Sequence, residues 1–189
     1  MCEKMIDNVE LDNEVLYKDI APKKNIVLIG MPGAGKSTIG VLLAKSLNYD
    51  FLDADLVIQQ QYNKKLYEII NEVGIDEFLE IENNVISGIE RCGTVIATGG
   101  SAVYGKNAMK HLKDKGIVVY LKLSCVEIIN RISNITTRGI AMKKGKTIFD
   151  IYEERVPLYE LYADITIDAE NLSIEETVSK VVDEIVNKS

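Results

Sequence analysis

The most informative stretch of the chain is residues 30–37, which fit the pattern Gly-x-x-x-x-Gly-Lys-Ser of a phosphate-binding loop. An apolar run at residues 26–29 precedes it and indicates a buried strand, and apolar side chains recur at helical spacing up to Leu47 after it. Glycines let backbone N–H groups close around phosphates, and a helix N-terminus adds positive potential. The sequence therefore predicts a nucleotide-binding site.

The residue types in this loop predict separate contacts. Lys36 is expected to reach the β- and γ-phosphates, and Ser37 is expected to ligate Mg²⁺. Further nucleotide contacts are expected from Gly33, Ala34, Gly35 and Thr38. The alternative, an ordinary glycine-rich turn, rarely matches all four fixed positions by chance.

Two carboxylates follow the second predicted strand, residues 49–52. In an extended chain Asp53 and Asp55 would face the same way. One carboxylate could then hold Mg²⁺ or its water shell, while the other accepts the proton of an acceptor hydroxyl as the γ-phosphate leaves. The alternative is structural, with Asp55 as a helix N-cap and Asp53 as a solvated turn residue.

Two further segments are candidates for ligand contacts. Residues 98–101, Thr-Gly-Gly-Ser, follow the third predicted strand, where glycines let a substrate approach backbone N–H groups; the alternative is a plain turn. Residues 133–147 are polar, basic and poorly periodic, which is typical of a lid that closes over a triphosphate; the alternative is a solvated basic loop. Arg155 follows this segment and is a candidate anion clamp.

Composition limits the remaining functions. The formal net charge of −7 opposes a nonspecific nucleic-acid or membrane surface. Three separated cysteines and one histidine form neither a zinc spacing nor a disulfide framework. No apolar stretch is long enough to span a bilayer, and the start lacks a signal-peptide core. We expect a cytoplasmic monomer or weak dimer with no nucleic-acid or membrane partner.

Strands and helices alternate after a polar, acidic N-terminal stretch. We expect residues 1–24 to form a tail and residues 25–189 to form one α/β domain with a mostly parallel sheet, helices on both faces, and ligands at the carboxyl ends of the strands. The predicted strands are residues 26–29, 49–52, 94–97, 117–121 and 165–167. The predicted helices are residues 37–47, 56–62, 66–73, 75–91 and 108–113, and two more that begin at capping boxes opened by Ser124 and Ser173.

Taken together, the order and spacing of these motifs resemble the shikimate kinase family from about residue 24 to the end. The matching motifs are Gly-x-Pro-Gly-x-Gly-Lys-Ser-Thr at 30–38, Asp-x-Asp at 53–55, Gly-x-x-x-Phe-x-x-x-Glu at 74–82, Thr-Gly-Gly at 98–100, a lid arginine at 138 and Arg-x-Pro-Leu-Tyr at 155–159. The resemblance implies a single-domain P-loop kinase with a five-stranded parallel sheet and a mobile lid. It also implies transfer of the γ-phosphate of MgATP to the 3-hydroxyl of shikimate.

The resemblance further implies roles for individual residues. On the nucleotide side, Lys36 would bind phosphate, Ser37 would bind Mg²⁺, and Asp53 would support the metal. Arg138 would contact the phosphates from the lid, and Arg131 would lie near the nucleotide. On the acceptor side, Asp55 would act on the reacting hydroxyl, Gly99 and Gly100 would contact the substrate, and Arg155 would bind the shikimate carboxylate. The implied catalytic residues are Lys36, Asp55 and Arg138.

Four positions depart from the family pattern. Shikimate kinases usually have Phe-Arg where this chain has Phe-Leu at 78–79, and that arginine is one of two that clamp the carboxylate. The usual third glycine is Ser101, and the usual lid sequence Arg-Pro-Leu is Arg-Gly-Ile at 138–140. A charge-assisted hydrogen bond contributes about 1.5–3 kcal/mol, so its loss predicts roughly ten- to hundredfold weaker binding. Candidate replacements for the charge are Lys64, Lys65, Lys143, Lys144 and Lys146.

Two other functions remain as alternatives. One is a P-loop kinase of another small hydroxylated metabolite, for which gluconate and nucleoside-monophosphate kinases are the natural comparisons. The other is a catalytically silent nucleotide-binding protein. The joint presence of Lys36, Ser37, Asp53 and Asp55 favours a kinase, because a protein that only binds nucleotide needs no proton acceptor beside a metal carboxylate.

Overall fold

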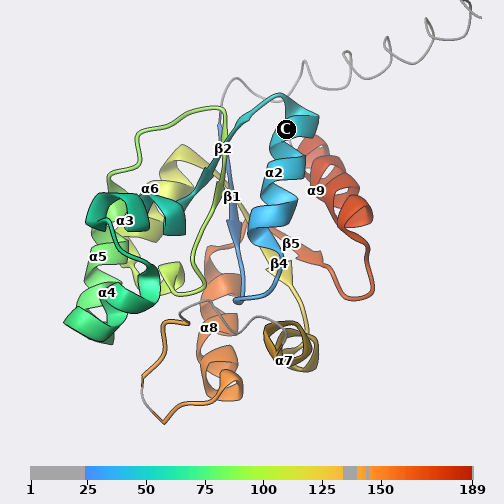
Figure 1. The fold of residues 1–189 in the computed structure, drawn as a ribbon. Helices are drawn as coiled ribbons and strands as arrows, with labels where there is room; N and C mark the ends of the chain where they lie inside the picture. The colour runs from blue at the N-terminus through green and yellow to red at the C-terminus, as the bar shows by residue number, and fades with distance from the viewer. Residues whose placement is uncertain (1–23, 134–139, 144, 189) are drawn as a thin grey trace, which may run out of the picture.

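A five-stranded parallel sheet forms the centre of the molecule, in the order β2-β3-β1-β4-β5 (Figure 1). The computed structural model describes residues 24–133, 140–143 and 145–188. The strands are β1 (Asn25–Ile29), β2 (Asp50–Asp53), β3 (Thr94–Ala97), β4 (Gly116–Lys122) and β5 (Ile165–Asp168). The predicted fold class and all five predicted strands are confirmed, each within two residues at either end.

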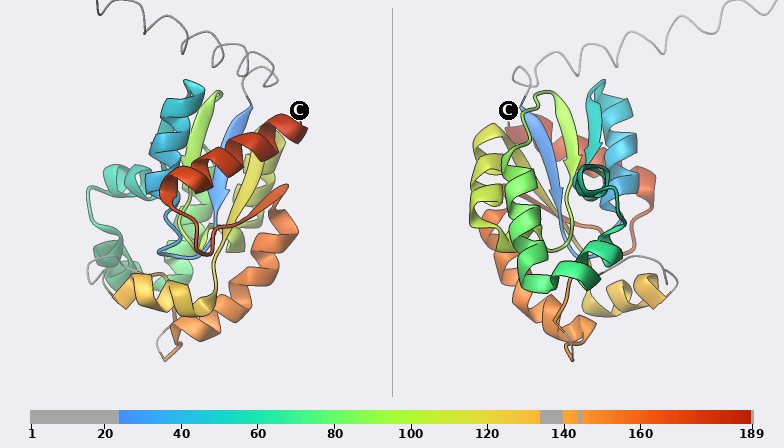
Figure 2. Two further views of the ribbon diagram at one scale, coloured as in Figure 1. Left: turned by 90° about the vertical axis from the view of Figure 1, so that its right-hand side faces the viewer. Right: turned by 60° about the vertical axis from the view of Figure 1, so that its left-hand side comes forward.

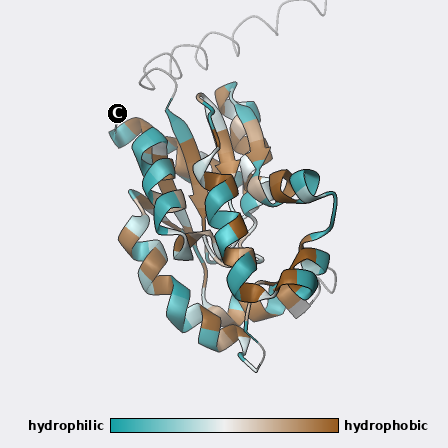
Figure 3. Cartoon of the chain, turned by 90° about the vertical axis from the view of Figure 1, so that its left-hand side faces the viewer, coloured by the Kyte–Doolittle hydropathy of each residue, from teal (hydrophilic) through white to brown (hydrophobic). Residues whose placement is uncertain are grey.

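The sequence of β1 explains its central place. All five of its residues are buried, and it pairs with β3 on one side and β4 on the other. Parallel strands that are covered on both faces need such a continuous apolar run. The central strands are accordingly brown in Figure 3, whereas the helices mix brown and teal. The P-loop thus leaves the central strand of the sheet, which fixes its position.

Helices cover both faces of this sheet (Figure 2). On one face lie α2 (Lys36–Leu47) and α9 (Ile174–Lys188), which contact each other. The other face carries α5 (Ile75–Ser87), α6 (Lys106–Lys115) and α8 (Ile148–Tyr162). The remaining elements are α3 (Ala54–Tyr62), α4 (Leu66–Val73), the short 3₁₀ helix η1 (Ala102–Tyr104) and α7 (Cys125–Ser133). Within the described residues, no helix has the length and apolar character that crossing a bilayer requires.

Two sequence predictions need correction, and one helix was missed. The helix predicted over 75–91 ends at Ser87, because Gly88 caps it and the chain turns there toward β3. Helix α8 was not predicted, since it contains Pro157; a capping box between Thr147 and Asp150 nevertheless starts it. At Ser124 only half of the predicted capping box forms: the Ser124 hydroxyl accepts from Glu127 N–H, but the Ser124 N–H donates to Glu170.

The capping box predicted at Ser173 is complete, because Ser173 and Glu176 each accept a hydrogen bond from the other's backbone N–H. The predicted lid, residues 133–147, is described only in part, and Arg138 lies outside the described residues. The predicted tail also lies outside them, apart from Lys24. These two predictions therefore stay predictions.

Candidate active site

The candidate site lies where β1, β2 and β3 end, at the carboxyl edge of the sheet, as parallel α/β folds favour. A small cavity of about 70 Å³ opens there. Most of the predicted site residues line it: Gly33, Gly35, Lys36, Ser37, Asp55, Gly99, Gly100 and Arg155. Residues from the P-loop, α3, the end of β3 and α8 thus meet in one place.

The P-loop has the backbone that its glycines allow. Gly33 and Gly35 have φ angles of 83° and 88°, a region that side chains with a Cβ rarely adopt, and Gly35 directly precedes the first turn of α2. The Lys36 side chain is largely buried, and its ammonium donates to the carbonyl oxygens of Gly30 at 2.8 Å and Met31 at 2.9 Å. The charge is therefore held at the loop, beside the helix N-terminus.

Ser37 and Asp53 form a pair beneath the loop. The Ser37 hydroxyl donates to Asp53 Oδ2 at 2.7 Å, while Asp53 Oδ1 accepts from the Asp55 N–H at 3.0 Å. Asp53 is the N-cap of α3, so both sequence interpretations of this motif were partly wrong: the segment is not extended, and the capping residue is Asp53 rather than Asp55. The helix start sends the two carboxylates to different neighbours, Asp53 to Ser37 and Asp55 to the cavity.

The glycines after β3 allow close approach to the backbone. A Cβ on Gly99 would lie 2.7 Å from Asp55 Oδ1 and 2.4 Å from Glu82 Oε1, and a Cβ on Gly100 would lie 2.6 Å from the Pro32 side chain. Glycine is therefore needed here by its surroundings rather than by a turn. Gly99 and Gly100 both line the cavity, so this part of the prediction is compatible with a substrate contact.

Arg155 is far more deeply buried than arginine side chains usually are. It is 1 % exposed and projects from α8 into the cavity wall. Its Nη2 donates to the Ala141 carbonyl, and its Nε donates to the Tyr104 hydroxyl at 3.3 Å. Its Nη1 is buried without a hydrogen-bond partner. A buried guanidinium N–H of this kind can bind an anionic ligand.

Glu82 was quoted in a motif but given no role, and the structure brings it into the site. It is 2 % exposed on α5 and lines the cavity with Asp55. Burial raises the pKa of Glu82 from 4.5 to about 7, and the charge of Asp55 also raises it. A hydrogen bond from Ser101 and the positive charges of Arg155 and Lys36 lower the pKa and offset part of this rise. The signal in the sequence was the i, i+4 spacing from the buried Phe78.

Arg131 lies beside the P-loop, and its predicted position near the nucleotide stays a prediction. It is on α7, and a Cβ on Gly33 would lie 3.6 Å from the Arg131 Cβ. Its Nε donates to Glu127 Oε1 at 2.6 Å, one helical turn away. The contact orients the guanidinium without burying it, since about a third of each side chain is exposed.

Leu79 does not line the cavity that contains Arg155. It lines a neighbouring cavity of about 240 Å³ together with Tyr104, Lys143 and Lys146, and Ala141 separates the two by lining both. Lys143 pairs there with Asp76, and Lys146 pairs with Glu154. Of the other candidate replacements, Lys64 pairs with Glu72, Lys65 is exposed at the start of α4, and Lys144 lies outside the described residues. None of the described lysines proposed as a replacement lines the Arg155 cavity.

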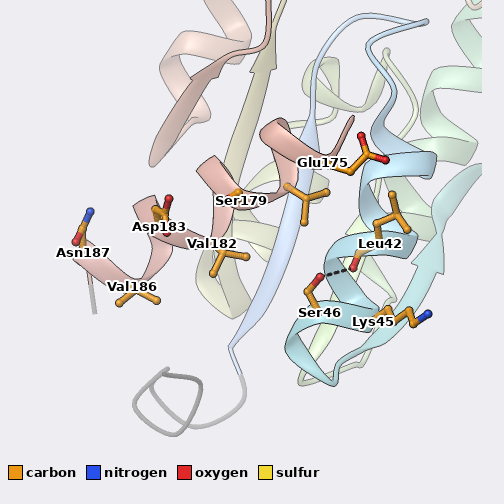
Figure 4. Close-up of a pocket in the computed structure, with 10 residues that line it drawn as sticks. Leu42, Lys45, Ser46, Glu175, Ser179, Val182, Asp183, Val186 and Asn187 are labelled. Carbon is orange, nitrogen blue, oxygen red and sulfur yellow. Dashed lines mark hydrogen bonds between the residues drawn. The ribbon is translucent and has the colours of Figure 1, made fainter. Parts of the chain in front are cut away.

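A larger hollow than this cavity lies elsewhere. It is a groove of about 850 Å³ between α2 and α9, lined by residues such as Leu42, Lys45 and Val182 (Figure 4). Leu42 and Lys45 belong to the half of α2 that is remote from the P-loop, and Val182 belongs to α9. The small cavity is the candidate site because the titratable groups and the glycine loops converge there.

Comparison with known proteins gives one family. A sequence profile of the family described as shikimate kinase matches residues 32–186. A shikimate kinase of Thermodesulfovibrio yellowstonii is 38% identical over 164 residues, which cover 85% of this chain and 94% of that protein. One from Haemophilus influenzae is 36% identical over 172 residues, or 89% and 96% of the two chains.

Solved structures agree. A shikimate kinase from Acinetobacter baumannii, solved in complex with shikimate, superposes with a TM-score of 0.82 at 27% identity and covers 94% of this chain and 98% of that one. A shikimate kinase from Aquifex aeolicus gives a TM-score of 0.73 at 29% identity and covers 87% and 97%. The chain therefore belongs to the shikimate kinase family, whose members are phosphotransferases with an alcohol acceptor.

Proposed function

We propose that this protein transfers the γ-phosphate of ATP to the 3-hydroxyl of shikimate. The observation that carries the proposal is the meeting of three groups in one cavity: the P-loop with Lys36, the carboxylate of Asp55, and the buried, unpartnered Nη1 of Arg155. A phosphate donor, a hydroxyl and a carboxylate each find a complementary group there. Family membership supports shikimate as the acceptor.

The nucleotide half of the site would position the phosphates. Lys36 would exchange its hydrogen bonds with the loop carbonyls for the β- and γ-phosphate oxygens. Ser37 and Asp53 would hold Mg²⁺, since a hydroxyl and a carboxylate 2.7 Å apart supply the hard oxygen ligands that this ion prefers. When bound, Mg²⁺ neutralises charge on the phosphate oxygens. Arg131 would contact the nucleotide, and Arg138 would add positive charge from the lid.

The acceptor half would orient one hydroxyl for attack. Asp55 would accept a hydrogen bond from the 3-hydroxyl and take its proton during transfer. Gly99 and Gly100 would let the ring lie against the backbone, and Arg155 Nη1 would bind the carboxylate. Ile140 and Ala141 also line the cavity.

A coupled assay of ADP formation tests this function. The purified protein with MgATP is given shikimate, gluconate, homoserine or CMP in turn, and the phosphorylated product is identified by mass spectrometry. We expect saturable turnover that is highest with shikimate. Efficient turnover of another alcohol without shikimate phosphorylation would support the sister-kinase alternative. Nucleotide binding without turnover of any acceptor would support a silent binding protein.

The predicted cytoplasmic location and the monomeric or weakly dimeric state accompany this proposal as predictions. A sedimentation measurement would test the second of them.

A further inference from the structure

The groove between α2 and α9 is lined by apolar side chains from both helices (Figure 4). Its volume is about 850 Å³, and its apolar lining consists of Leu42 on α2 and Val178, Val182 and Val186 on α9. Val186 is 37 % exposed, and Val41, beside Leu42, is 49 % exposed. Covering apolar surface contributes about 25 cal/mol for each Å² removed from water. A groove of this size and lining therefore indicates a segment or partner that covers it.

The described chain begins beside one end of this groove. Lys24 precedes β1, and the Asn25 side chain accepts a hydrogen bond from the Thr94 N–H at 3.1 Å. The adjoining Gly93 carbonyl accepts from the Asp50 N–H at 3.0 Å, two residues after the C-cap of α2. The start of β1 thus lies at the same edge of the sheet as the end of α2.

Helix α9 ends at this edge as well. Lys188 Nζ donates to the Asp164 carbonyl, and the Asp164 N–H donates to the Val118 carbonyl at 2.8 Å. Val118 in turn pairs with Val27 of β1. In Figure 2 the start of β1 and the C-terminal end of α9 lie at the same end of the molecule. The residues that precede Lys24 therefore enter the fold next to the groove.

Residues 1–23 lie outside the described residues, and their sequence has an apolar side that matches the groove. At about 100° per residue of a helix, four apolar side chains fall within about 60° of one another: Met5, Val9, Leu16 and Ile20. Acidic side chains gather on the other side of the same helical projection: Glu3, Asp7, Glu10 and Glu14. This spacing favours an amphipathic helix, whose apolar side needs a surface to pack on.

The segment is long enough to lie along the groove. Glu175 and Asn187 are the outermost lining residues on α9, about 18 Å apart at the helical rise of 1.5 Å per residue (Figure 4). A helix over residues 5–20 would be about 24 Å long. Pro22 would end it, and residues 21–24 would connect it to β1. A short connection of this kind gives the segment an effective concentration in the millimolar range, which favours it over a second copy of the chain.

We propose that residues 5–20 occupy the groove between α2 and α9. The apolar side with Met5, Val9, Leu16 and Ile20 packs on the apolar lining, and the acidic side faces solvent. The segment then joins α9 to the half of α2 that is remote from the P-loop. This interaction does not depend on the function proposed above.

Cysteine labelling of the full chain measures whether the groove is covered. Ser179→Cys places a thiol in the groove, and the control Glu184→Cys places one on the same helix outside the lining. Both positions are exposed in the described part of the chain. Alkylation by iodoacetamide is followed separately at each peptide by mass spectrometry, so the three natural cysteines do not interfere.

Substitutions in the segment show whether it is the cover. Leu16→Asp should raise the labelling rate of Ser179→Cys at least about tenfold, because packing a carboxylate on an apolar surface is costly. The matched control Leu11→Asp makes the same change on the opposite side of the helical projection and should leave the rate unchanged. The labelling rate of Glu184→Cys should be the same with every form of the segment.

Three results would overturn the inference. If Leu16→Asp leaves the labelling of Ser179→Cys unchanged, the segment does not cover the groove. If Leu11→Asp accelerates labelling as much as Leu16→Asp, the apolar side is not what packs there. Protection that disappears when the protein is diluted would identify a second copy as the occupant. Circular dichroism checks folding, and Val9→Asp replaces Leu16→Asp if that variant is unfolded.

Discussion

The buried carboxyl of Glu82 makes the stability of the unliganded protein depend on pH, and Glu82→Gln should remove that dependence. In the folded chain, burial raises the Glu82 pKa from 4.5 to about 7, and Asp55 adds to this while Ser101, Arg155 and Lys36 oppose it. The substituted amide has nearly the same shape but does not ionise between these values. The comparison therefore isolates one ionisation.

The protein should become less stable as the pH rises, because the pKa of Glu82 is higher in the folded chain than in the unfolded chain. Below about pH 4.5 the carboxyl is protonated in both folded and unfolded chains, so its burial carries no ionisation penalty. As the pH rises, the unfolded chain ionises first, and stability is lost until the folded carboxyl ionises near pH 7. At about 1.4 kcal/mol per pKa unit, the total loss for a shift from 4.5 to about 7 is roughly 3 kcal/mol.

Urea unfolding of the unliganded proteins measures this loss. Between about pH 5 and about pH 8, the free energy of unfolding of wild type should fall by roughly 2 to 3 kcal/mol relative to that of Glu82→Gln. Any difference that is constant with pH reflects packing or hydrogen bonding and is not counted. The control Glu80→Gln, which changes an exposed glutamate on the same helix, should follow wild type across the range. A wild-type curve parallel to that of Glu82→Gln would refute a raised pKa in the folded state.

Three further predictions concern catalysis. Lys36→Ala should weaken ATP binding and abolish turnover, because it removes the charge on the β- and γ-phosphates; normal turnover would contradict the P-loop assignment. In Mg²⁺ titrations, Asp53→Asn should mainly raise the Mg²⁺ concentration that turnover requires. Asp55→Asn should abolish turnover and leave the affinity for MgATP almost unchanged. Normal catalysis by both variants at saturating Mg²⁺ would refute the separate roles given to the two carboxylates. Leu79→Arg should lower KM for shikimate about tenfold by supplying a second cation near the shikimate carboxylate. An unchanged or higher KM would show that Leu79 instead forms an apolar wall of the site.

The position and backbone of the P-loop were predictable because their information is local in the sequence. Residues 30–37 contain the loop glycines, the lysine and the serine that is proposed to ligate Mg²⁺ in one uninterrupted run. The apolar pattern on either side predicts the strand and the helix that hold this run. Strand positions followed for the same reason, since buried parallel strands are short apolar runs. The error at this motif was small in sequence but changed the chemistry, because α3 starts at Ala54, two residues before the predicted start, and so directs Asp53 and Asp55 to different neighbours.

The acceptor half depends on packing between distant segments. Glu82 comes from α5, Gly99 from the end of β3, and Arg155 from a helix that Pro157 hid from prediction. Nothing in the spacing of these residues shows that Arg155 is 1 % exposed or that its Nη1 is left without a partner. Such properties arise only when the helices pack over the sheet.

The departures at positions 79 and 101 look independent in the sequence, yet both act on one side chain. Leucine at 79 removes a cation at i, i+3 from Glu82, and serine at 101 supplies a hydrogen bond to the same carboxyl. A buried carboxylate that loses an ion-pair partner is destabilised, whereas one that gains a neutral donor is partly compensated. Leucine at position 79 and serine at position 101 therefore both change the surroundings of one buried carboxyl, the first by leaving no cation one helical turn away and the second by supplying a neutral hydrogen-bond donor.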